Sequence, residues 1–271
     1  MVVQHNMQAV NTNRMLGQNV KAVQKSTEKL SSGYAVNRAG DDAAGLSISE
    51  KMRNQIRGLN QSVKNAEDGI SLIQTAEGNM NEIHSILQRM GELAIKSRND
   101  VNATEDRRSI NDEVVQLKAE ISAITTKAEF NGTKLLNGDM SKGKLLQVGA
   151  NQGETMAISI KGTSLSNLGL ADTSVSTGVK ASTAIGKIQS AIKNVSAQRS
   201  LLGAIQNRLE YTINNLENYS ENLTSAESNI RDTDMATEMV NYSKNNILQQ
   251  AAQSMLAQAN QSNQGVLSLL Q

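Results

Sequence analysis

The sequence predicts a mainly α fold: a long antiparallel helical bundle or coiled coil with a small β-hairpin region, in which the amino- and carboxy-terminal helices pair. Apolar residues recur at helical spacing over most of the chain. None of the 271 residues is a proline, so no pyrrolidine ring interrupts a long helix. With one Phe, four Tyr and no Trp, the core must consist of aliphatic side chains and Met, which suits thin helical layers.

The first helix is predicted at residues 3–32. Its apolar residues follow combined steps of three and four, which gives one narrow stripe that needs a partner surface. A cluster of turn-forming residues at 31–40 ends this helix, and Asp41 or Asp42 can cap the next one. The stripe comprises Val3, Met7, Val10, Val20, Val23 and Leu30.

Three further helical runs follow. Residues 52–94 have the alternating steps of four and three that are typical of coiled coils, with one phase slip. Residues 110–128 keep the same period after a polar break, so we expect an antiparallel neighbour of the preceding helix. Residues 185–230 predict a helix of about 50 residues, roughly 75 Å long at ~1.5 Å per residue.

The stretch from 131 to 178 is rich in Gly, Ser and Thr and predicts the non-helical part of the chain. Apolar and polar residues alternate on both sides of a turn at 151–154, which predicts one β-hairpin. A short hairpin is marginal by itself, so we expect it to lie against the helical bundle. The alternating apolar residues are Leu146, Val148 and Ala150 before the turn and Met156, Ile158 and Ile160 after it.

The final segment, residues 235–271, predicts a helix with its apolar residues on one side and no charged residue after Lys244. Copies of such a helix can pack without like-charge repulsion, whereas helices that bind membrane surfaces usually carry Lys or Arg on the polar face. The segment therefore favours protein neighbours over lipid. Its apolar side comprises Met239, Tyr242, Ile247, Leu248, Ala252, Met255, Leu256 and Ala259.

Composition argues against several classes of function. The absence of cysteine excludes thiol catalysis and Cys-based metal centres. A net charge of +1 gives no basic excess for binding nucleic acid or an anionic membrane, and no segment approaches the ~20 apolar residues of a membrane span. His5 and His84 belong to no metal-binding motif, and paired Asp41 and Asp42 are more typical of helix capping than of acid–base chemistry. We expect no enzyme, no catalytic residue, no metal and no cofactor.

Several segments resemble bacterial flagellins, in family order. The amino-terminal flagellin region is similar to LSSGYAVNRAGDDAAGLSISEKMRNQIRGLNQ at 30–61 and DGISLIQTAEG at 68–78. The start of the flagellin hairpin region is similar to EFNGTKLLNG at 129–138. The carboxy-terminal region is similar to AQRSLLGAIQNRLEYTINNL at 197–216, SAESNIRDTDMATEM at 225–239 and KNNILQQAAQSMLAQANQ at 244–261.

The resemblance implies a fold in which the terminal helices form an inner coiled-coil layer, and the long helices with the hairpin form the next layer out. Many flagellins insert further domains after the EFNG segment, but this chain is short there, so the resemblance implies a minimal form without a large outer domain. We therefore expect a filament-core domain of residues 1–40 with 232–271, and a rod domain of residues 41–231 that includes the hairpin region at 131–178.

The resemblance also implies a secreted structural subunit that polymerises into the extracellular flagellar filament for motility. Amphipathic ends with no core of their own become ordered on a partner, and non-closing contacts between identical subunits build an open helical filament. The family implies type III export, with an export chaperone, the filament cap and hook-junction proteins as partners. We expect polymerisation contacts at Met7, Val10, Val20, Val23, Leu248, Met255 and Leu256.

A second implied role is recognition by the innate immune receptor Toll-like receptor 5. The family motif LQRxREL reads LQRMGEL at 87–93, so Gly91 stands in place of an arginine. The chain lacks the forked hydrogen-bond donor that the arginine of the motif would supply. A glycine also lowers the stability of a helix by ~0.5 to 1 kcal/mol relative to Ala. Both differences imply weaker recognition by the receptor. The resemblance assigns receptor contacts to Gln88, Arg89, Glu92, Leu93 and Glu113.

Other interpretations stay open at this point. A hook–filament junction protein shares the terminal helices, but usually not the EFNG and SAESNIRD segments. From a different class, a soluble coiled-coil adaptor or a membrane-active amphipathic protein is compatible with such helices, although the uncharged carboxy-terminal face and the resemblance at both ends argue against it. Any single apolar stripe, taken alone, favours an ordinary intramolecular bundle.

Overall fold

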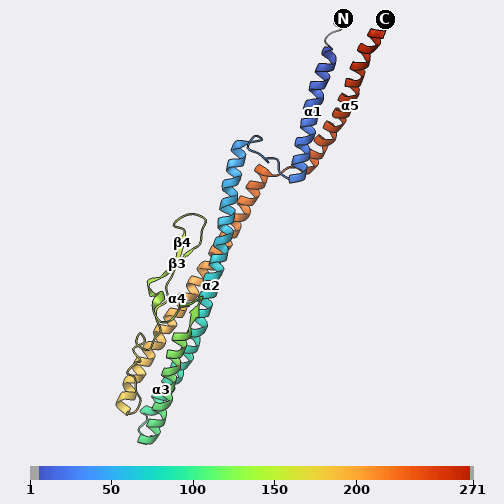
Figure 1. Ribbon diagram of the computed structural model, residues 1–271. Coiled ribbons are helices and arrows are strands. Elements are labelled where there is room, and N and C mark those ends of the chain that lie inside the picture. The colour runs from blue at the N-terminus through green and yellow to red at the C-terminus, as the bar shows by residue number, and fades with distance from the viewer. Residues whose placement is uncertain (1–5, 269–271) are drawn as a thin grey trace. The chain divides into compact units, whose positions relative to one another are not determined.

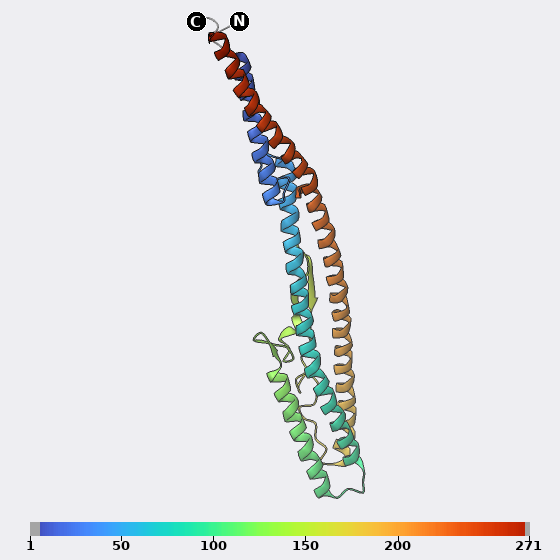
Figure 2. The ribbon, with the colours of Figure 1, turned by 90° about the vertical axis from the view of Figure 1, so that its right-hand side faces the viewer.

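The computed structural model describes residues 6–268 of the chain, and side chains from residue 6 to residue 262. Val3 of the predicted stripe lies outside the described residues. The chain divides into two compact units: the described parts of Met1–Asn54 with Glu221–Gln271, and Gln55–Ser220. Helices α2 (Ala43–Arg98) and α4 (Gly178–Arg231) contribute residues to both units (Figures 1 and 2). The domain boundaries expected from the sequence remain a prediction.

The first unit pairs the two ends of the chain. Helix α1 (Met7–Ser32) runs antiparallel to α5 (Met235–Ser268), and the two lie side by side in both ribbon views (Figures 1 and 2). At one end of this pair, the Asn6 side-chain amide donates a hydrogen bond of 2.9 Å to the carbonyl of Ala259. The predicted pairing of the terminal helices is confirmed.

The two aspartates that follow α1 have different roles. Asp42 caps α2, because its Oδ1 accepts hydrogen bonds from the N–H groups of Ala44 and Gly45. Asp41 instead forms an ion pair of 2.8 Å with Lys25. The hydrogen bond from Lys25 is the largest of the effects that lower the pKa of Asp41 from 3.8 to about 2. The pair is therefore present at neutral pH, and its stabilising contribution is lost as the pH falls from 3.8 to about 2.

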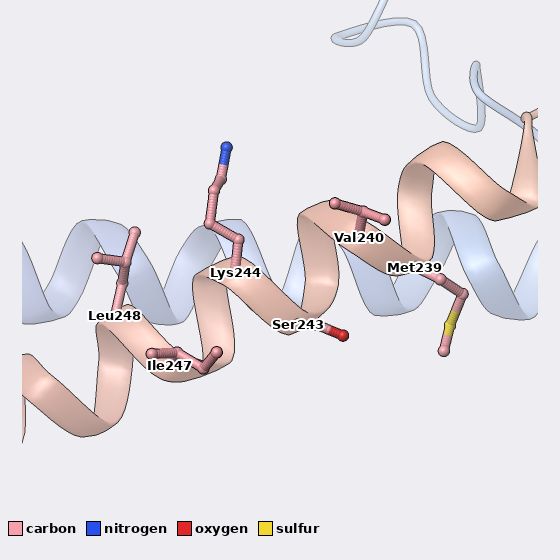
Figure 3. Close-up of a pocket in the computed structure, with 6 residues that line it drawn as sticks. All are labelled: Met239, Val240, Ser243, Lys244, Ile247 and Leu248. Atoms are coloured by element: carbon pink, nitrogen blue, oxygen red, sulfur yellow. The ribbon is translucent and has the colours of Figure 1, made fainter.

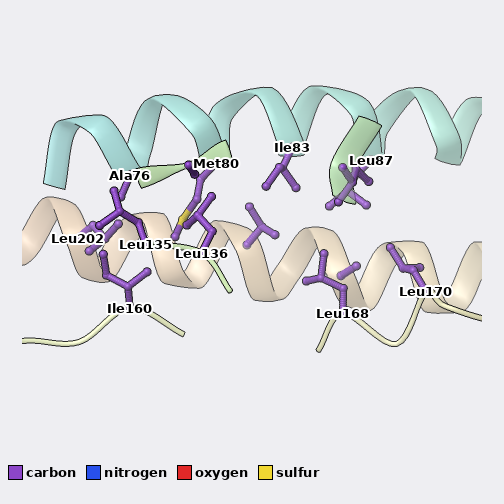
Figure 4. Close-up of a cluster of buried hydrophobic side chains, with 14 of the residues drawn as sticks. Ala76, Met80, Ile83, Leu87, Leu135, Leu136, Ile160, Leu168, Leu170 and Leu202 are labelled. Atoms are coloured by element: carbon purple, nitrogen blue, oxygen red, sulfur yellow. The ribbon is translucent and has the colours of Figure 1, made fainter. Parts of the chain in front are cut away.

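The second unit has one hydrophobic core, shared by three helices and the segment that joins α3 to α4. Helix α3 (Thr104–Lys127) follows α2 after a short connection and lies beside it (Figures 1 and 2), as the sequence predicted. Figure 4 shows Met80 and Leu87 pointing from α2 into the space between α2 and α4, where Leu136 and Leu168 of the joining segment also lie.

One series of buried residues on α2 in the second unit keeps an unbroken spacing of three and four through Ile73, Ala76 and Met80, so the phase slip predicted there is wrong. The prediction followed large apolar residues such as Val63 and Ile70, which are half-buried, while Ser62 and Gly69 occupy the buried positions next to them. Small residues at core positions carry no hydrophobic signal in the sequence. The series comprises Leu59, Ser62, Ala66, Gly69, Ile73, Ala76, Met80, Ile83, Leu87, Met90, Ala94 and Ser97, and Leu93 beside Ala94 is buried as well.

The segment between α3 and α4 contains two hairpins, where the sequence predicted one. In the first, β1 (Glu129–Phe130) pairs with β2 (Thr133–Lys134). Asn131 and Gly132 form the turn between them, with positive φ angles of 46° and 74°. Asn-Gly is the strongest short-range signal for a tight hairpin, so the sequence did contain the sign of this missed element.

The second hairpin is the predicted one, with shorter strands. After the 3₁₀ helix η1 (Asp139–Lys142), β3 (Lys144–Gln147) pairs antiparallel with β4 (Thr155–Ile158), and Leu146 lies opposite Met156. The expected strand residues beyond these limits, Val148, Ala150 and Ile160, lie outside the ladder.

Two glycines of α2 let this hairpin approach the helix closely. A Cβ on Gly69 would lie 2.6 Å from the Leu146 Cδ2, and one on Gly58 would lie 2.9 Å from the Ala150 Cβ. Between them, the Asn65 side-chain amide donates a hydrogen bond of 3.1 Å to the carbonyl of Gln147. The expected packing of the hairpin against the helices is confirmed, and with it the mainly α fold class.

Candidate assembly and recognition surfaces

Helix α5 has two chemically different sides. The side that pairs with α1 is half-buried and mostly polar or small, whereas large apolar side chains lie on the exposed side. The prediction that the apolar residues share one side is therefore wrong, because Tyr242, Ala252, Leu256 and Ala259 belong to the half-buried side. One series of half-buried positions recurs at steps of four and three, with Asn241 and Asn246 half-buried beside it: Glu238, Tyr242, Asn245, Gln249, Ala252, Leu256 and Ala259.

The exposed side of α5 carries an apolar surface that we call the outer apolar face: Val240, Ile247, Leu248 and Met255, which are 45% to 68% exposed. Figure 3 shows Val240, Ile247 and Leu248 projecting from the helix around Lys244. Val240, Ile247 and Leu248 line a shallow groove of about 500 Å³, together with Met239, Ser243 and Lys244. Leu248 and Met255 were predicted contact residues. Val240 was missed, although it precedes Ile247 by seven residues and so shares its side of the helix.

Helix α1 also divides its predicted contact residues between two sides. Met7 and Val10 are 70% and 62% exposed, whereas Val20 and Val23 are half-buried. The single stripe expected from the sequence is absent, because the ten residues from Val10 to Val20 turn ~1000° about the helix axis and leave the two side chains on different sides. Leu16, which the stripe omitted, is half-buried with Val20 and Val23.

Arg89 lies at the centre of an exposed ion-pair cluster on α2 and α3. Its Nε and Nη2 donate hydrogen bonds of 3.0 and 2.9 Å to the Oε1 of Glu113, and its Nη1 donates one of 3.1 Å to the Oε2 of Glu92. The hydrogen bond to Glu113 is the first cause of a raised pKa for Arg89. Gln88 is exposed, and its Nε2 lies 3.1 Å from the Nε2 of His84. Four of the five predicted receptor contacts therefore lie at neighbouring exposed positions.

The fifth predicted receptor contact, Leu93, is a core residue. It is 3% exposed and belongs to the hydrophobic core of the second unit. Leu93 follows the buried Met90 by three residues and therefore lies on the same side of α2. Gly91, between them in sequence, is half-buried with room for a side chain, since a Cβ there would lie 3.7 Å from the Ile188 Cγ2.

Residues 6–268 contain neither a membrane-spanning helix nor a cluster of metal ligands. None of the helices described there is long and apolar enough to cross a membrane. Within the same residues, no group of three or more His, Asp or Glu side chains is placed to hold a metal ion.

Family models of bacterial flagellin match both ends of the chain. The N-terminal helical region matches residues 3–141, and the C-terminal helical region matches residues 185–270. The chain belongs to the bacterial flagellin family. This flagellin is a structural subunit of the extracellular flagellar filament and not an enzyme, as the sequence predicted.

Full-length relatives support the same conclusion. The chain is 53% identical to the flagellin of Halalkalibacterium halodurans and 47% identical to the flagellin of Bacillus subtilis, with complete coverage of both chains in each case. The first of these alignments spans only 272 residues, which agrees with a minimal flagellin that lacks a large outer domain. The crystal structure of Bacillus cereus flagellin is similar with a TM-score of 0.52 and 31% identity, over 56% of this chain and 88% of that one.

The fold extends beyond the flagellins themselves. A putative flagellar hook-associated protein from Vibrio parahaemolyticus has a TM-score of 0.61 with this flagellin, over 71% of this chain and 100% of that one, at 13% identity. A likeness at that identity shows a shared fold alone. The family models and the full-length relatives therefore favour flagellin over the hook-junction and coiled-coil adaptor alternatives.

Proposed function

We propose that this flagellin polymerises through the outer apolar face of α5, together with the exposed start of α1. The observation that carries the proposal is a row of large, exposed apolar side chains on a helix that is already paired on its opposite side. Burying one such side chain contributes ~1.5 to 3 kcal/mol, so a few contacts per subunit supply a strong drive towards association. Identical subunits whose contacts do not close into a ring build an open filament.

Charge supports identical subunits as the partner. In the described part of the chain, α5 has no charged residue after Lys244, so two copies can meet there without like-charge repulsion. The predicted contact residues divide between two roles in this proposal. Val20, Val23 and Leu256 hold the α1–α5 pair together. The contacts to neighbouring subunits come from Met7, Val10, Leu248 and Met255, which are exposed.

A charge placed on the outer apolar face is expected to block assembly. Ile247→Lys should raise the critical concentration for elongation by about tenfold or more, because each subunit contact would bury an ammonium group with no partner. The measurement is light scattering after purified subunits are mixed with short filament seeds. Gln253→Lys is the matched control. Gln253 is exposed on the same helix, but it follows Ile247 by six residues, a rotation of ~600°, and so lies on a different side of the helix. Equal elongation by the two variants would contradict the proposal.

We also propose that the protein is secreted through the flagellar type III apparatus, with an export chaperone, the filament cap and hook-junction proteins as partners. Membership of the flagellin family supports this. The exposed apolar side chains of α5 add a physical reason for a chaperone, since such a surface risks premature association inside the cell. Retention of the protein inside cells that lack the flagellar export apparatus tests the route, and undiminished secretion there would exclude it.

A second proposed role is as a ligand of Toll-like receptor 5, favoured by the exposed cluster around Arg89. The side chains of Arg89, Glu92 and Glu113 are 53%, 69% and 44% exposed, so a receptor can reach all three. The guanidinium already donates to both carboxylates, so the cluster offers a fixed arrangement of charge rather than a free arginine. Leu93 is buried, so it contributes to this surface only indirectly, by packing α2 against the hydrophobic core.

Gly91→Arg is expected to raise the potency of receptor signalling by about tenfold, because it restores the arginine of the family motif and with it a charged, forked hydrogen-bond donor. Dose–response curves from reporter cells that express the receptor measure this. Gly78→Arg is the matched control, since it makes the same change on an exposed part of α2 where a Cβ has nothing within 4 Å. Unchanged potency for Gly91→Arg would remove the role assigned to position 91.

A further inference from the structure

The α1–α5 pair meets through polar and small side chains with only a few large apolar ones among them. On α5 the half-buried Asn245 and Gln249 accompany Tyr242 and Leu256. On α1 the half-buried Thr12 and Asn19 and the buried Ser26 accompany Leu16, Val20 and Val23. Large apolar residues normally set the register of two paired helices, because a shift of one turn exposes them. Polar and small residues lose little in such a shift, since each finds similar neighbours. The few apolar contacts therefore leave a role for contacts at the ends of the pair in setting its register.

Backbone hydrogen bonds join the turn after α1 to the turn before α5. The N–H of Ala35 donates to the carbonyl of Arg231 at 2.7 Å, and the N–H of Thr233 donates to the carbonyl of Gly33 at 2.9 Å. These two bonds form an antiparallel bridge in which Tyr34 lies opposite Asp232. Backbone bonds of this kind cannot form if one turn slides along the other by a residue.

The side chain of Arg231 fastens this bridge. Its guanidinium lies 4.8 Å from the centroid of the Tyr34 ring, and its Nη1 donates a hydrogen bond of 2.8 Å to the Oε1 of Glu50 on α2. The Arg231 side chain is only 11% exposed, so water weakens its interaction with the ring less than at an open surface. We call residues 33–35, residues 231–233 and Glu50 the clasp.

We infer that the clasp sets the register of α1 against α5, and thereby decides whether the exposed residues of the two helices line up for polymerisation. The polymerisation step of this inference rests on the proposed function. Arg231 is a positioning residue, because it acts through the helices and not by contact with another subunit. Without the clasp, α1 and α5 can slide past each other or exchange between subunits, although the residues of the outer apolar face are unchanged.

The register of α1 against α5 can be tested on the monomer by disulfide formation between two introduced cysteines, because the chain contains no cysteine of its own. Asn6→Cys with Ala259→Cys places a reporter pair at the opposite end of the helix pair from the clasp, where the native side chain and carbonyl are 2.9 Å apart. Adding Arg231→Gln should slow disulfide formation in dilute subunits by about tenfold. The control Arg53→Gln removes an arginine 3.7 Å from Glu50 and should leave the rate unchanged. Equal rates for these two variants would overturn the inference.

The effect on polymerisation can be tested with a reversible replacement of the clasp. Tyr34 and Asp232 form a bridge pair with no hydrogen bond between them. Such pairs have Cα atoms ~4.5 Å apart, within the ~4.4 to 6.8 Å range of disulfides. The variant Tyr34→Cys with Asp232→Cys lacks the aromatic ring when reduced, and should then need about tenfold more subunits to elongate filament seeds. Oxidation should restore elongation to the level of the unmodified chain.

The outcomes separate the clasp from the proposed function. A reduced variant that elongates as the unmodified chain does, or a defect that oxidation fails to repair, would overturn the role of the clasp in polymerisation. An unmodified chain that does not elongate seeds contradicts the proposed function instead. In that case the cross-linking rates of the monomer still decide whether Arg231 sets the register.

Discussion

Subunits that lack residues 245–271 are expected to stay soluble and to form no filaments. The truncation removes Ile247, Leu248 and Met255 of the outer apolar face, and with them the proposed contacts to neighbouring subunits. It also removes Leu256, so most of α1 loses the helix that covers its half-buried side. Solubility should persist because the apolar residues of α1 are separated by polar ones. Electron microscopy after heating, cooling and addition of filament seeds measures the loss.

The full-length chain, treated in the same way, is the control for this truncation. Circular dichroism should show that the truncated chain keeps the helices of the second unit, because the described residues of its core all precede the removed segment. Normal filaments from the truncated chain would contradict the assignment of polymerisation to α5. Loss of the whole helical signal would contradict the independence of the second unit from the removed segment.

Leu87→Ala is expected to lower the free energy of unfolding by about 2 to 5 kcal/mol, the range found when a buried leucine is cut back and leaves a cavity. Leu87 is completely buried in the core of the second unit, beside residues of the segment that joins α3 to α4 (Figure 4). Neighbouring backbone from several elements limits how far this site can collapse. Urea unfolding of subunits kept below the concentration for assembly measures the change.

Ile95→Ala is the matched control, since Ile95 lies on the same helix and is 62% exposed. Its loss should change the free energy of unfolding by less than ~0.5 kcal/mol, as is usual for surface substitutions. A loss below ~1 kcal/mol for Leu87→Ala would mean that the α2 core can close over the cavity. Filament formation by Ile95→Ala should be unchanged, because the proposed assembly surface lies on the terminal helices and does not include Ile95.

The helices could be predicted wherever large apolar residues mark the buried side. Val195, Leu202 and Leu209 recur every seven residues on α4, and all three are buried. The prediction failed where small residues fill buried positions, as Ser62 and Gly69 do on α2, because burial of a small side chain leaves no hydrophobic pattern. Gly69 leaves space for Leu146 of the β3–β4 hairpin, and that need is a long-range contact that no local window contains.

The candidate assembly surface could be located from the sequence but not oriented. The missing charge after Lys244 pointed to α5, yet neighbouring residues face opposite ways: Met255 is exposed and Leu256 is half-buried. Which side meets α1 depends on the pairing of segments from opposite ends of the chain. Arg231 and Tyr34 were missed for the same reason, because their contact joins the end of α4 to a turn that is distant in sequence and follows no period.

The hairpin that rests on Gly58 and Gly69 has a consequence for protein engineering. Its body is anchored to α2, while residues 151–155 at its tip are all exposed. Lengthening an exposed tip costs little, since closure entropy grows slowly with loop length. A guest peptide grafted there would leave the anchoring glycines and the terminal helices untouched. Each subunit of a filament would then display one copy, so a single genetic insertion would give a regularly spaced, multivalent array.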